Sequence, residues 1–392
     1  MDYTKILSPT VTDIKPSGIR KYFDIADSME DVISLGVGEP DFPTPWEIRK
    51  AGILSLESGK TRYTSNWGLE QLRREICNYM KRKYRLSYEP KTDVLVTVGG
   101  SEAIDACIRA VTCPGDEIII PQPSYVCYEP IVRLAGGTPV IIETRAETDF
   151  KLTAEQQRAS ISPRTKALIL PYPCNPTGAI MEREDLEEIA AVLRDTDIFV
   201  ISDEIYSELT FGDHSHVSIA EIDGMHERCV VVNGFSKTFS MTGWRLGYAC
   251  GPAPIIKQVT KIHQFAIMCA PTTSQYAAIE ALKDGLSDNF ATVEEMRDSY
   301  DKRRKFVLHS LQEIGLHCFE PKGAFYAFPS VKKTGLNGEI FAENLLKEHK
   351  VAVVPGSAFG SFGENNVRIS YATSMNALSQ AFDKMQDFVS KL

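Results

Sequence analysis

Short apolar runs alternate with helix-like segments between residues 90 and 250. The runs lack polar alternation, which is typical of strands that are buried on both faces of a mostly parallel sheet. Seven such runs occur, at 94–98, 117–120, 139–142, 167–170, 198–202, 229–232 and 246–250. Helical patterns cover 101–111, 125–135 and 184–194. Strand and helix alternation of this kind predicts an α/β fold.

The pattern changes towards both ends of the chain. After residue 285, a long charged amphipathic helix at 292–314 precedes short strands and a terminal helix from Met375, which predicts a smaller α+β domain. The short strands are expected at 324–328, 351–354 and 367–371. The first 40 or so residues are punctuated by Pro and Gly and resemble an arm. We therefore predict an arm with part of the small domain at 1–45, a large domain at 46–285 and a small domain at 286–392.

Composition narrows the class of protein. The chain has 392 residues with 43 Lys and Arg against 52 Asp and Glu, a net charge of -9, which argues against nucleic acid or an anionic membrane as the main partner. No apolar run approaches the ~18 residues of a membrane span, and no signal peptide is evident at the N-terminus. The nine Cys form no C-x-x-C pair, so we expect buried free thiols rather than disulfides or zinc. These features predict a cytoplasmic protein.

The segment 233–248 (NGFSKTFSMTGWRLGY) directly follows a predicted strand, where α/β sheets place their ligands. Lys237 stands among small, hydroxyl and aromatic residues rather than other charges. A desolvated lysine has a lowered pKa and can act as a Schiff-base nucleophile. Arg245 could bind a phosphate with its fork of donors. The alternative is a lysine and an arginine on a surface loop.

Asp203 directly follows the predicted strand 198–202 and should lie in a poorly solvated place. A carboxylate there is costly unless a cation pairs with it, and a pyridinium nitrogen would serve. Tyr206 would present its phenol on the same side if the chain turns helically. The alternative is that Asp203 caps a following helix.

Two further loops follow predicted strands. Three Pro within 171–176 make a rigid loop that holds Asn175, a neutral donor suited to a phenolate oxygen, although it could equally be a turn residue. The glycines of 98–104 (VGGSEAI) let backbone N–H groups approach an anion at a helix start, although no dinucleotide or NTP motif is matched. Tyr125 is a candidate aromatic platform beside this helix, or else a core residue.

Taken in order, these segments resemble the class I aminotransferases of pyridoxal 5′-phosphate (PLP) fold type I, over nearly the whole chain. The chain is most similar to the bacterial branch that contains aspartate, aromatic-amino-acid and N-acetyl-diaminopimelate aminotransferases. The matching pieces are 38–42 (GEPDF), Tyr63, 99–101, Tyr125, 175–178 (NPTG), 203–206 (DEIY), Ser236 with Lys237, 243–245 (GWR) and 368–371 (RISY). The resemblance implies a large domain with a mostly parallel seven-stranded sheet between helices, and a smaller α+β domain.

The resemblance also implies roles around the cofactor ring. Lys237 would form the Schiff base and move the proton between the substrate Cα and the cofactor. Asp203 would keep the pyridine nitrogen protonated, so that the ring withdraws electrons. Asn175 and Tyr206 would hydrogen-bond the phenolic oxygen, and Tyr125 would stack on the ring. The catalytic residues are thus expected to be Lys237, Asp203 and Tyr206.

Phosphate and substrate contacts follow from the same resemblance. A phosphate cup is expected from Ser236, Arg245 and the backbone of Gly100, Ser101 and Glu102. Tyr63 would complete the cup of a second subunit, which makes a homodimer part of the expected mechanism. Arg368 would grip the substrate α-carboxylate, with Asn175 and the Gly38 backbone beside it. The alternative for Arg368 is an ion pair on an edge strand.

One position departs from the pattern of an aspartate-dedicated enzyme. Relatives in this branch that favour aspartate commonly carry a lysine where this chain has Ser101. Ile19, beside Ser17 and Gly18, and Trp67, close after Tyr63, would add apolar walls. The hypothesis is therefore a ping-pong aminotransferase for aromatic, other uncharged or aspartate-like donors, with 2-oxoglutarate as an acceptor.

Three other functions are compatible with parts of this pattern. A C–S β-lyase could use the same cofactor motifs. An effector-binding module fused to a DNA-binding helix-turn-helix is disfavoured, because no basic domain precedes residue 20. Metal catalysis is disfavoured because His214 and His216 share a loop with no further ligand at metal spacing, which favours a solvated loop.

Overall fold

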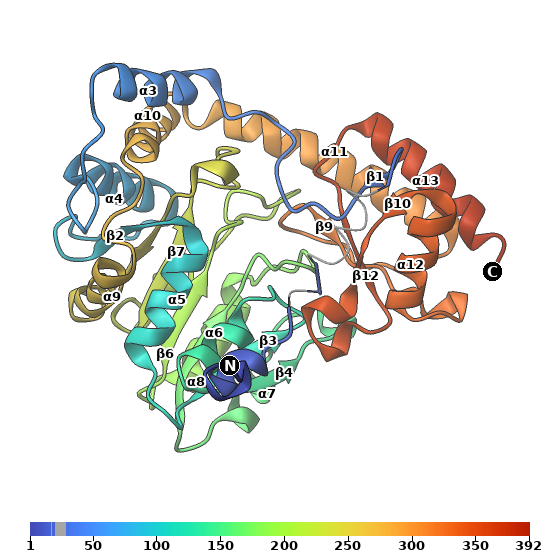
Figure 1. The fold of residues 1–392 in the computed structure, drawn as a ribbon, viewed down its shortest axis with the longest axis horizontal. Helices are drawn as coiled ribbons and strands as arrows, with labels where there is room; N and C mark the ends of the chain where they lie inside the picture. The colour runs from blue at the N-terminus through green and yellow to red at the C-terminus, as the bar shows by residue number, and fades with distance from the viewer. Residues whose placement is uncertain (17, 20–28) are drawn as a thin grey trace.

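The computed structural model describes residues 1–16, 18, 19 and 29–392. Residues 17 and 20–28 of the predicted arm, Ser17 among them, lie outside the described residues. A seven-stranded sheet forms the centre of the larger part (Figure 1). Its strands are β2 (Val94–Thr97), β3 (Glu117–Gln122), β4 (Thr138–Glu143), β5 (Thr165–Leu170), β6 (Phe199–Asp203), β7 (Cys229–Gly234) and β8 (Gly247–Cys250).

The strand order is β2-β8-β7-β6-β5-β3-β4. The strands from β7 to β4 all pair in parallel, and β8 runs antiparallel to both of its neighbours. The predicted mostly parallel sheet is therefore confirmed, and each of the seven apolar runs became one of its strands. Because parallel strands end at the same edge, the segments after β5, β6 and β7 meet there.

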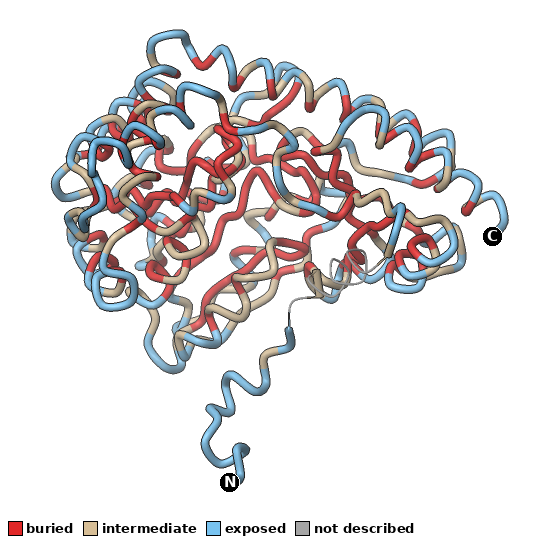
Figure 2. The backbone as a smooth tube through the Cα atoms, turned by 45° about the horizontal axis from the view of Figure 1, so that its top comes forward, coloured by how far each residue is buried: buried red, intermediate tan, exposed pale blue. Residues whose placement is uncertain are grey.

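Helices cover both faces of this sheet. Successive strand residues belong to different buried clusters. Leu168 is part of the cluster that includes residues of α4, α8 and α10, whereas Ile169 is part of the cluster that includes residues of α5, α6 and α9. Such burial on both faces is why the strands lack polar alternation. Figure 2 shows the buried segments gathered in the interior of the body, with the exposed N-terminal segment that carries α1 (Pro9–Thr12) projecting from it. The helices of this part are α3 (Trp46–Glu57), α4 (Glu70–Tyr84), α5 (Gly99–Val111), α6 (Tyr128–Leu134), α7 (Ala154–Ser160), α8 (Arg183–Leu193), α9 (Ala253–Ala266) and α10 (Thr272–Asp288).

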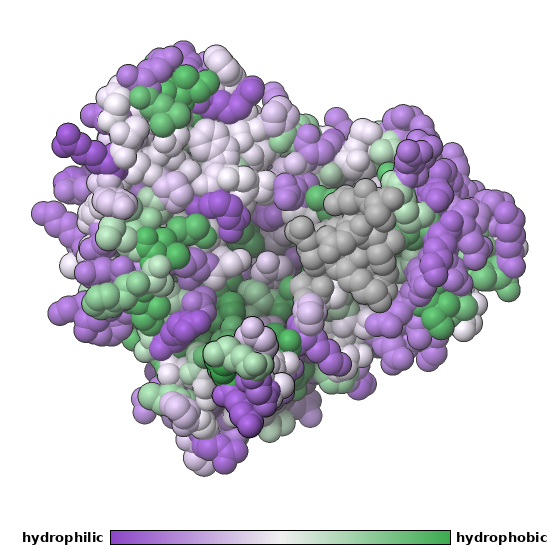
Figure 3. All heavy atoms as spheres, viewed as in Figure 1, coloured by the Kyte–Doolittle hydropathy of each residue, from purple (hydrophilic) through white to green (hydrophobic). Residues whose placement is uncertain are grey.

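The C-terminal part is α+β, as predicted. Its elements are α11 (Ala291–Ile314), β9 (Tyr326–Ala327), α12 (Gly338–His349), β10 (Val351–Ala352), β11 (Val354–Pro355), β12 (Val367–Ser370) and α13 (Met375–Val389). The strands form the sheet β11-β12-β9, and β10 pairs in parallel with β1 (Ile33–Ser34) of the N-terminal segment. Polar residues cover much of the outer surface of this part (Figure 3). The proposed domain limits stay predictions; the one at 285 falls in the last turn of α10.

The composition led to two predictions, one on membrane-spanning segments and one on the cysteines. Among the described residues, no helix combines the length and apolar content that a membrane crossing requires. All nine cysteines are free, as expected. The expectation that they are buried is wrong for Cys113, which is exposed, and holds only partly for Cys127, Cys269 and Cys318.

Candidate active site

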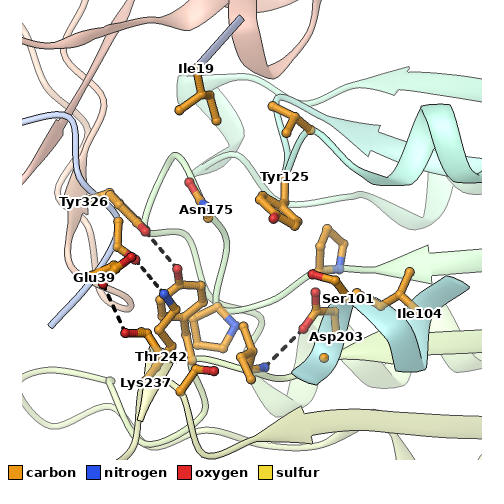
Figure 4. Close-up of a pocket in the computed structure, with 18 of the residues that line it drawn as sticks. Ile19, Glu39, Ser101, Ile104, Tyr125, Asn175, Asp203, Lys237, Thr242 and Tyr326 are labelled. Carbon is orange, nitrogen blue, oxygen red and sulfur yellow. Dashed lines mark hydrogen bonds between the residues drawn. The ribbon is translucent and has the colours of Figure 1, made fainter. Parts of the chain in front are cut away.

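A cavity of about 580 Å³ lies where the segments after β5, β6 and β7 meet strand β12 of the C-terminal part. This volume suits a small molecule. Figure 4 shows residues from both parts of the chain around it. The sequence-predicted residues that line it are Ile19, Gly38, Gly100, Ser101, Tyr125, Asn175, Asp203, Tyr206, Ser236, Lys237, Arg245 and Arg368.

Lys237 follows β7 and turns into the cavity, so the surface-loop alternative is wrong for this residue. Its ammonium nitrogen donates a hydrogen bond to the carbonyl oxygen of Gly38 at 2.5 Å. Burial lowers the pKa of Lys237 to about 8, and the charges of Arg368 and Arg245 act in the same direction. Part of the Lys237 population is therefore a neutral, nucleophilic amine near neutral pH.

Asp203 ends β6 and is 6% exposed. The Tyr128 hydroxyl donates to its Oδ2 at 2.7 Å, and the backbone N–H of Ile205 donates to Oδ1 at 3.2 Å. Ile205 lies in a turn, so the helix-cap alternative is wrong. Burial raises the pKa of Asp203 to about 6. A carboxylate in this state would be stabilised by a cationic partner in the cavity.

The start of α5 forms one end of the cavity. Its N-cap residue, Val98, makes no side-chain cap, so the first N–H groups of the helix have no such partner. Gly99 has φ +77°, and a Cβ there would lie 2.8 Å from Nη2 of Arg245. Arg245 is exposed at this end, and Ser236 is buried beside the cavity. A helix N-terminus, a guanidinium and a hydroxyl together suit a phosphate.

Arg368 enters the cavity from β12, the central strand of its sheet. Nη1 donates to Oδ1 of Asn175 at 2.9 Å, and Nη2 donates to the carbonyl oxygen of Gly36 at 2.5 Å. The buried Nε has no hydrogen-bond partner among the residues that the structure describes. Burial lowers the Arg368 pKa, and no carboxylate within the described ranges pairs with it. The alternative interpretation of Arg368 as part of an ion pair on an edge strand is therefore wrong. Its side chain suits an anionic ligand instead.

Several expected residues lie elsewhere. Glu102 does not line the cavity: its Oε2 accepts from the Val98 N–H at 2.6 Å, and its Oε1 lies 2.7 Å from Nδ1 of His263. Tyr63 is 80% exposed and stands outside the cavity of its own chain. Trp67 packs against the buried cluster that contains residues of α5 and α9. It does not line this cavity, so the expectation that Trp67 adds an apolar wall to it is wrong.

Other residues that line the cavity were not predicted from the sequence. Tyr128 binds Asp203, and its spacing of three from Tyr125 was the available signal. The hydroxyl of Tyr326 lies 2.8 Å from that of Tyr206, although only a short strand was predicted there. Glu39 belongs to the GEPDF segment and accepts a hydrogen bond from the Thr242 hydroxyl at 3.1 Å.

The solvated loop expected around His214 and His216 is wrong for His216. Its side chain is 7% exposed, and Nε2 lies 2.8 Å from the buried carboxylate of Glu204. His214 is more exposed and lies 3.1 Å from Glu182. Across the described part of the chain, no group of three or more His, Cys, Asp or Glu side chains could hold a metal ion.

Comparisons with known proteins agree with this geometry. Residues 30–385 match the model of the family described as aminotransferase class I and II. The YugH protein of Bacillus subtilis (strain 168) is 52% identical over 388 residues, which cover 99% of each chain. The aspartate aminotransferase of Pyrococcus abyssi is 48% identical over 95% of each chain. The crystal structure of the aromatic aminotransferase from Pyrococcus horikoshii OT3 superposes with a TM-score of 0.90 at 45% identity, covering 95% of this chain and 99% of that one. The chain therefore belongs to the aminotransferases of class I and II.

Proposed function

We propose that the chain binds PLP in this cavity through Lys237 and moves amino groups between L-amino acids and 2-oxo acids by a ping-pong mechanism. Transamination itself is the activity of the family to which the chain belongs, and the named relatives do not favour the lyase alternative. One observation carries the assignment of the cofactor. A lysine with a lowered pKa and a buried carboxylate with a raised pKa line the same cavity.

The groups around the cavity fit PLP. Its phosphate matches the uncapped start of α5 with Ser236 and Arg245. Its pyridine nitrogen, when protonated, is the cation that Asp203 lacks. Its phenolic oxygen matches the amide of Asn175 and the hydroxyl of Tyr206, and Tyr125 offers a ring for stacking. When bound, PLP supplies an electron sink for the electron pair that a proton leaves at the substrate Cα.

Lys237 would act both as the anchor and as the base. Its neutral amine can take a proton from the substrate Cα, and its ammonium can return one at the neighbouring carbon of the cofactor. The pKa of about 8 keeps both forms available near neutral pH. The Gly38 carbonyl, which accepts from Nζ at 2.5 Å, holds this nitrogen at the cavity wall.

Arg368 would bind the α-carboxylate of either substrate. Its free Nε and the fork of its guanidinium suit a carboxylate. Burial strengthens the attraction, because little water screens the charge. Asn175 accepts from Nη1 and would fix the guanidinium in one orientation. Binding there excludes water and orients the bond at Cα that breaks.

The charges that line the cavity also favour some amino donors over others. The cations among its described lining residues are Lys237, Arg245 and Arg368, and each has a proposed partner already. Ser101 brings no charge, and Glu39 would repel an acidic side chain. These features support aromatic or other uncharged donors, with 2-oxoglutarate as an acceptor. We expect kcat/KM for phenylalanine and alanine to exceed that for aspartate; an aspartate preference of about tenfold would contradict this proposal.

A homodimer would complete the site. Tyr63 is 80% and Phe265 is 87% exposed. The Asn66 side chain donates to the Met268 carbonyl at 2.7 Å, which joins the segment that carries Tyr63 to the turn after α9, whose last turn carries Phe265. Exposed aromatic residues on two adjoining segments favour a protein interface. We propose that a second copy covers them and that Tyr63 reaches the phosphate end of its neighbour. The cytoplasmic location stays a prediction.

Sedimentation and PLP titration test the dimer. Phe265→Glu should shift the dimer towards monomer, whereas Phe362→Glu, which changes a 43% exposed residue of the C-terminal part, should not. Tyr63→Phe should keep the dimer but weaken PLP binding by about tenfold, the value of one hydrogen bond to a charged group. A monomer that binds PLP with full affinity would exclude the shared site.

Borohydride trapping tests the proposed attachment. After reduction of the PLP-loaded protein, peptide mapping should find the label on Lys237. Lys237→Arg should abolish the label, whereas Lys151→Arg, which changes a lysine paired with Glu182 and Asp185, should retain it. Label elsewhere, or none, would exclude the proposal. An assay for pyruvate and ammonia released from cystathionine distinguishes the β-lyase alternative from transamination.

A further inference from the structure

Tyr326 lies between the two halves of the site, and none of the sequence motifs described above gives it a role. It belongs to β9 and is 1% exposed. Its hydroxyl lies 2.8 Å from the Tyr206 hydroxyl. Its ring lies under the Arg368 guanidinium, with 4.4 Å from Cζ to the ring centroid. A Cβ at Gly38 would come within 2.5 Å of the Tyr326 hydroxyl oxygen, so the Gly38 backbone also packs against it.

These contacts link both sides of the proposed reaction centre. Arg368 is the proposed carboxylate clamp, Gly38 accepts the hydrogen bond from Lys237, and Tyr206 is the proposed ligand of the phenolic oxygen. We propose that Tyr326 is a positioning residue whose hydroxyl donates to Tyr206 and thereby aims the Tyr206 proton into the cavity, at the phenolic oxygen of PLP. This inference rests on the proposed function.

The direction of the hydrogen bond decides its effect. Each hydroxyl carries one proton, so Tyr206 can donate into the cavity only if it accepts from Tyr326. The positive charge of Arg368 over the Tyr326 ring stabilises negative charge on that hydroxyl oxygen, which makes Tyr326 the better donor. In agreement, burial raises the pKa of Tyr206 well above its ordinary value, and Tyr326 adds to that rise; burial also raises the pKa of Tyr326. The Arg368 charge opposes the rise in both tyrosines, and at Tyr326 its effect is second only to burial.

A chain of two hydroxyl groups ending at a negatively charged oxygen is cooperative, because each donated bond strengthens the next. The hydrogen bond from Tyr206 would reduce the negative charge on the phenolic oxygen. That oxygen would then attract the proton of the Schiff-base nitrogen less strongly. Loss of the Tyr326 hydroxyl should therefore let the nitrogen keep its proton to higher pH. The charged or titratable groups that face the two hydroxyls are Arg368, Tyr125, Glu39 and Lys237, and the variants below leave all four unchanged.

The test is a pH titration of the visible absorbance of the PLP-loaded enzyme. Tyr326→Phe retains the ring under Arg368 and should raise the midpoint by about 0.5 unit, which corresponds to part of one hydrogen bond. Tyr206→Phe should raise the midpoint further, and the double variant should match Tyr206→Phe alone. Tyr300→Phe is the matched control, since its hydroxyl is also buried and its ring packs against Phe325, next to Tyr326; its midpoint should equal that of the unmodified enzyme.

Each outcome has a definite meaning. A lower midpoint in Tyr326→Phe would mean that Tyr206 donates to Tyr326, and an unchanged midpoint would mean that the contact only packs the two parts together; either overturns the inference. Additive shifts in the double variant would overturn the claim that Tyr326 acts through Tyr206. If the unmodified enzyme fails borohydride trapping at Lys237, the proposed function falls and this inference with it. If trapping succeeds and the midpoint stays the same, only the inference falls.

Discussion

The guanidinium of Arg368 donates a hydrogen bond from Nη1 to Oδ1 of Asn175 at 2.9 Å, and so joins the central strand of the small sheet to the loop after β5. The two residues are 193 positions apart in the sequence. One side chain therefore orders the amide on the proposed cofactor side, while its own Nε has no partner in the described part of the chain. With the roles proposed for Arg368 and Asn175, a single buried cation would couple substrate binding to cofactor positioning.

Arg368→Lys should keep the charge but lose the fork of donors. Lysine cannot bind a carboxylate and the Asn175 amide in the same planar geometry, so kcat/KM for all donors should fall about 100-fold. Half-reaction kinetics with single donors measure this loss. Arg304→Lys is the matched control, because Arg304 is a buried arginine that pairs with Asp301 and Glu320; it should change kcat/KM little. A similar loss in both variants would point to packing instead of carboxylate binding.

Asp203 should make the stability of the PLP-free protein depend on pH. Burial raises its pKa from 3.8 to about 6, so between these values the folded state binds more protons than the unfolded state. Stability contributed by this group is then present below pH 4 and is lost as the pH rises to 6. The loss amounts to about 3 kcal/mol.

Asp203→Asn removes this titration while keeping the shape of the side chain. The difference in unfolding free energy between the two PLP-free proteins, measured in urea from pH 4.5 to 7, should shift in favour of the asparagine variant by about 2 kcal/mol, because part of the loss already occurs below pH 4.5. Bound PLP should remove most of the difference if its pyridinium pairs with the carboxylate. A difference that does not vary with pH would mean that Asp203 is ionised at its ordinary value.

The fold was predictable from sequence where burial left a simple pattern. The strands are buried on both faces, so their unbroken apolar runs marked them. Helix α3 escaped prediction because Trp46, Ile53 and Leu56 lie on its exposed side, which removes the contrast between an apolar and a polar face. Helices α4, α7, α9, α10 and α12 were also not predicted.

The residues of the candidate site were likewise predictable only where the sequence carried a simple pattern. Residues directly after strands were found, because the ends of parallel strands meet at one edge. Tyr326 was missed because its partner Tyr206 is 120 positions away, and a lone tyrosine carries no spacing signal. His216 was expected in solvent because nothing in its loop indicates that it packs against Glu204, which is completely buried.

Glu102 should act behind the phosphate end rather than in the cavity. Its carboxylate accepts from the Val98 N–H and contacts His263, whose side chain is fully buried. Glu102→Ala should release the turn before α5, lowering stability by about 2 kcal/mol and PLP affinity about tenfold. Glu102→Gln keeps one acceptor oxygen and should lose less of both. Urea unfolding and PLP titration measure the two effects; unchanged PLP affinity in Glu102→Ala would show that the turn holds without this contact.

Ser101→Lys should shift the donor preference towards acidic amino acids. Ser101 lines the cavity near the start of α5, and a lysine there would add a cation with no other proposed partner. A partly desolvated ion pair with the distal carboxylate of aspartate is worth about 1.5 kcal/mol, so the ratio of kcat/KM for aspartate over phenylalanine should rise about tenfold. Ser101→Met matches the lysine in length without the charge and should not raise this ratio. Because the pair is partly exposed, the gain of the lysine variant should also shrink in about 0.5 M salt. An equal gain in the methionine variant would attribute donor choice to cavity shape rather than to charge.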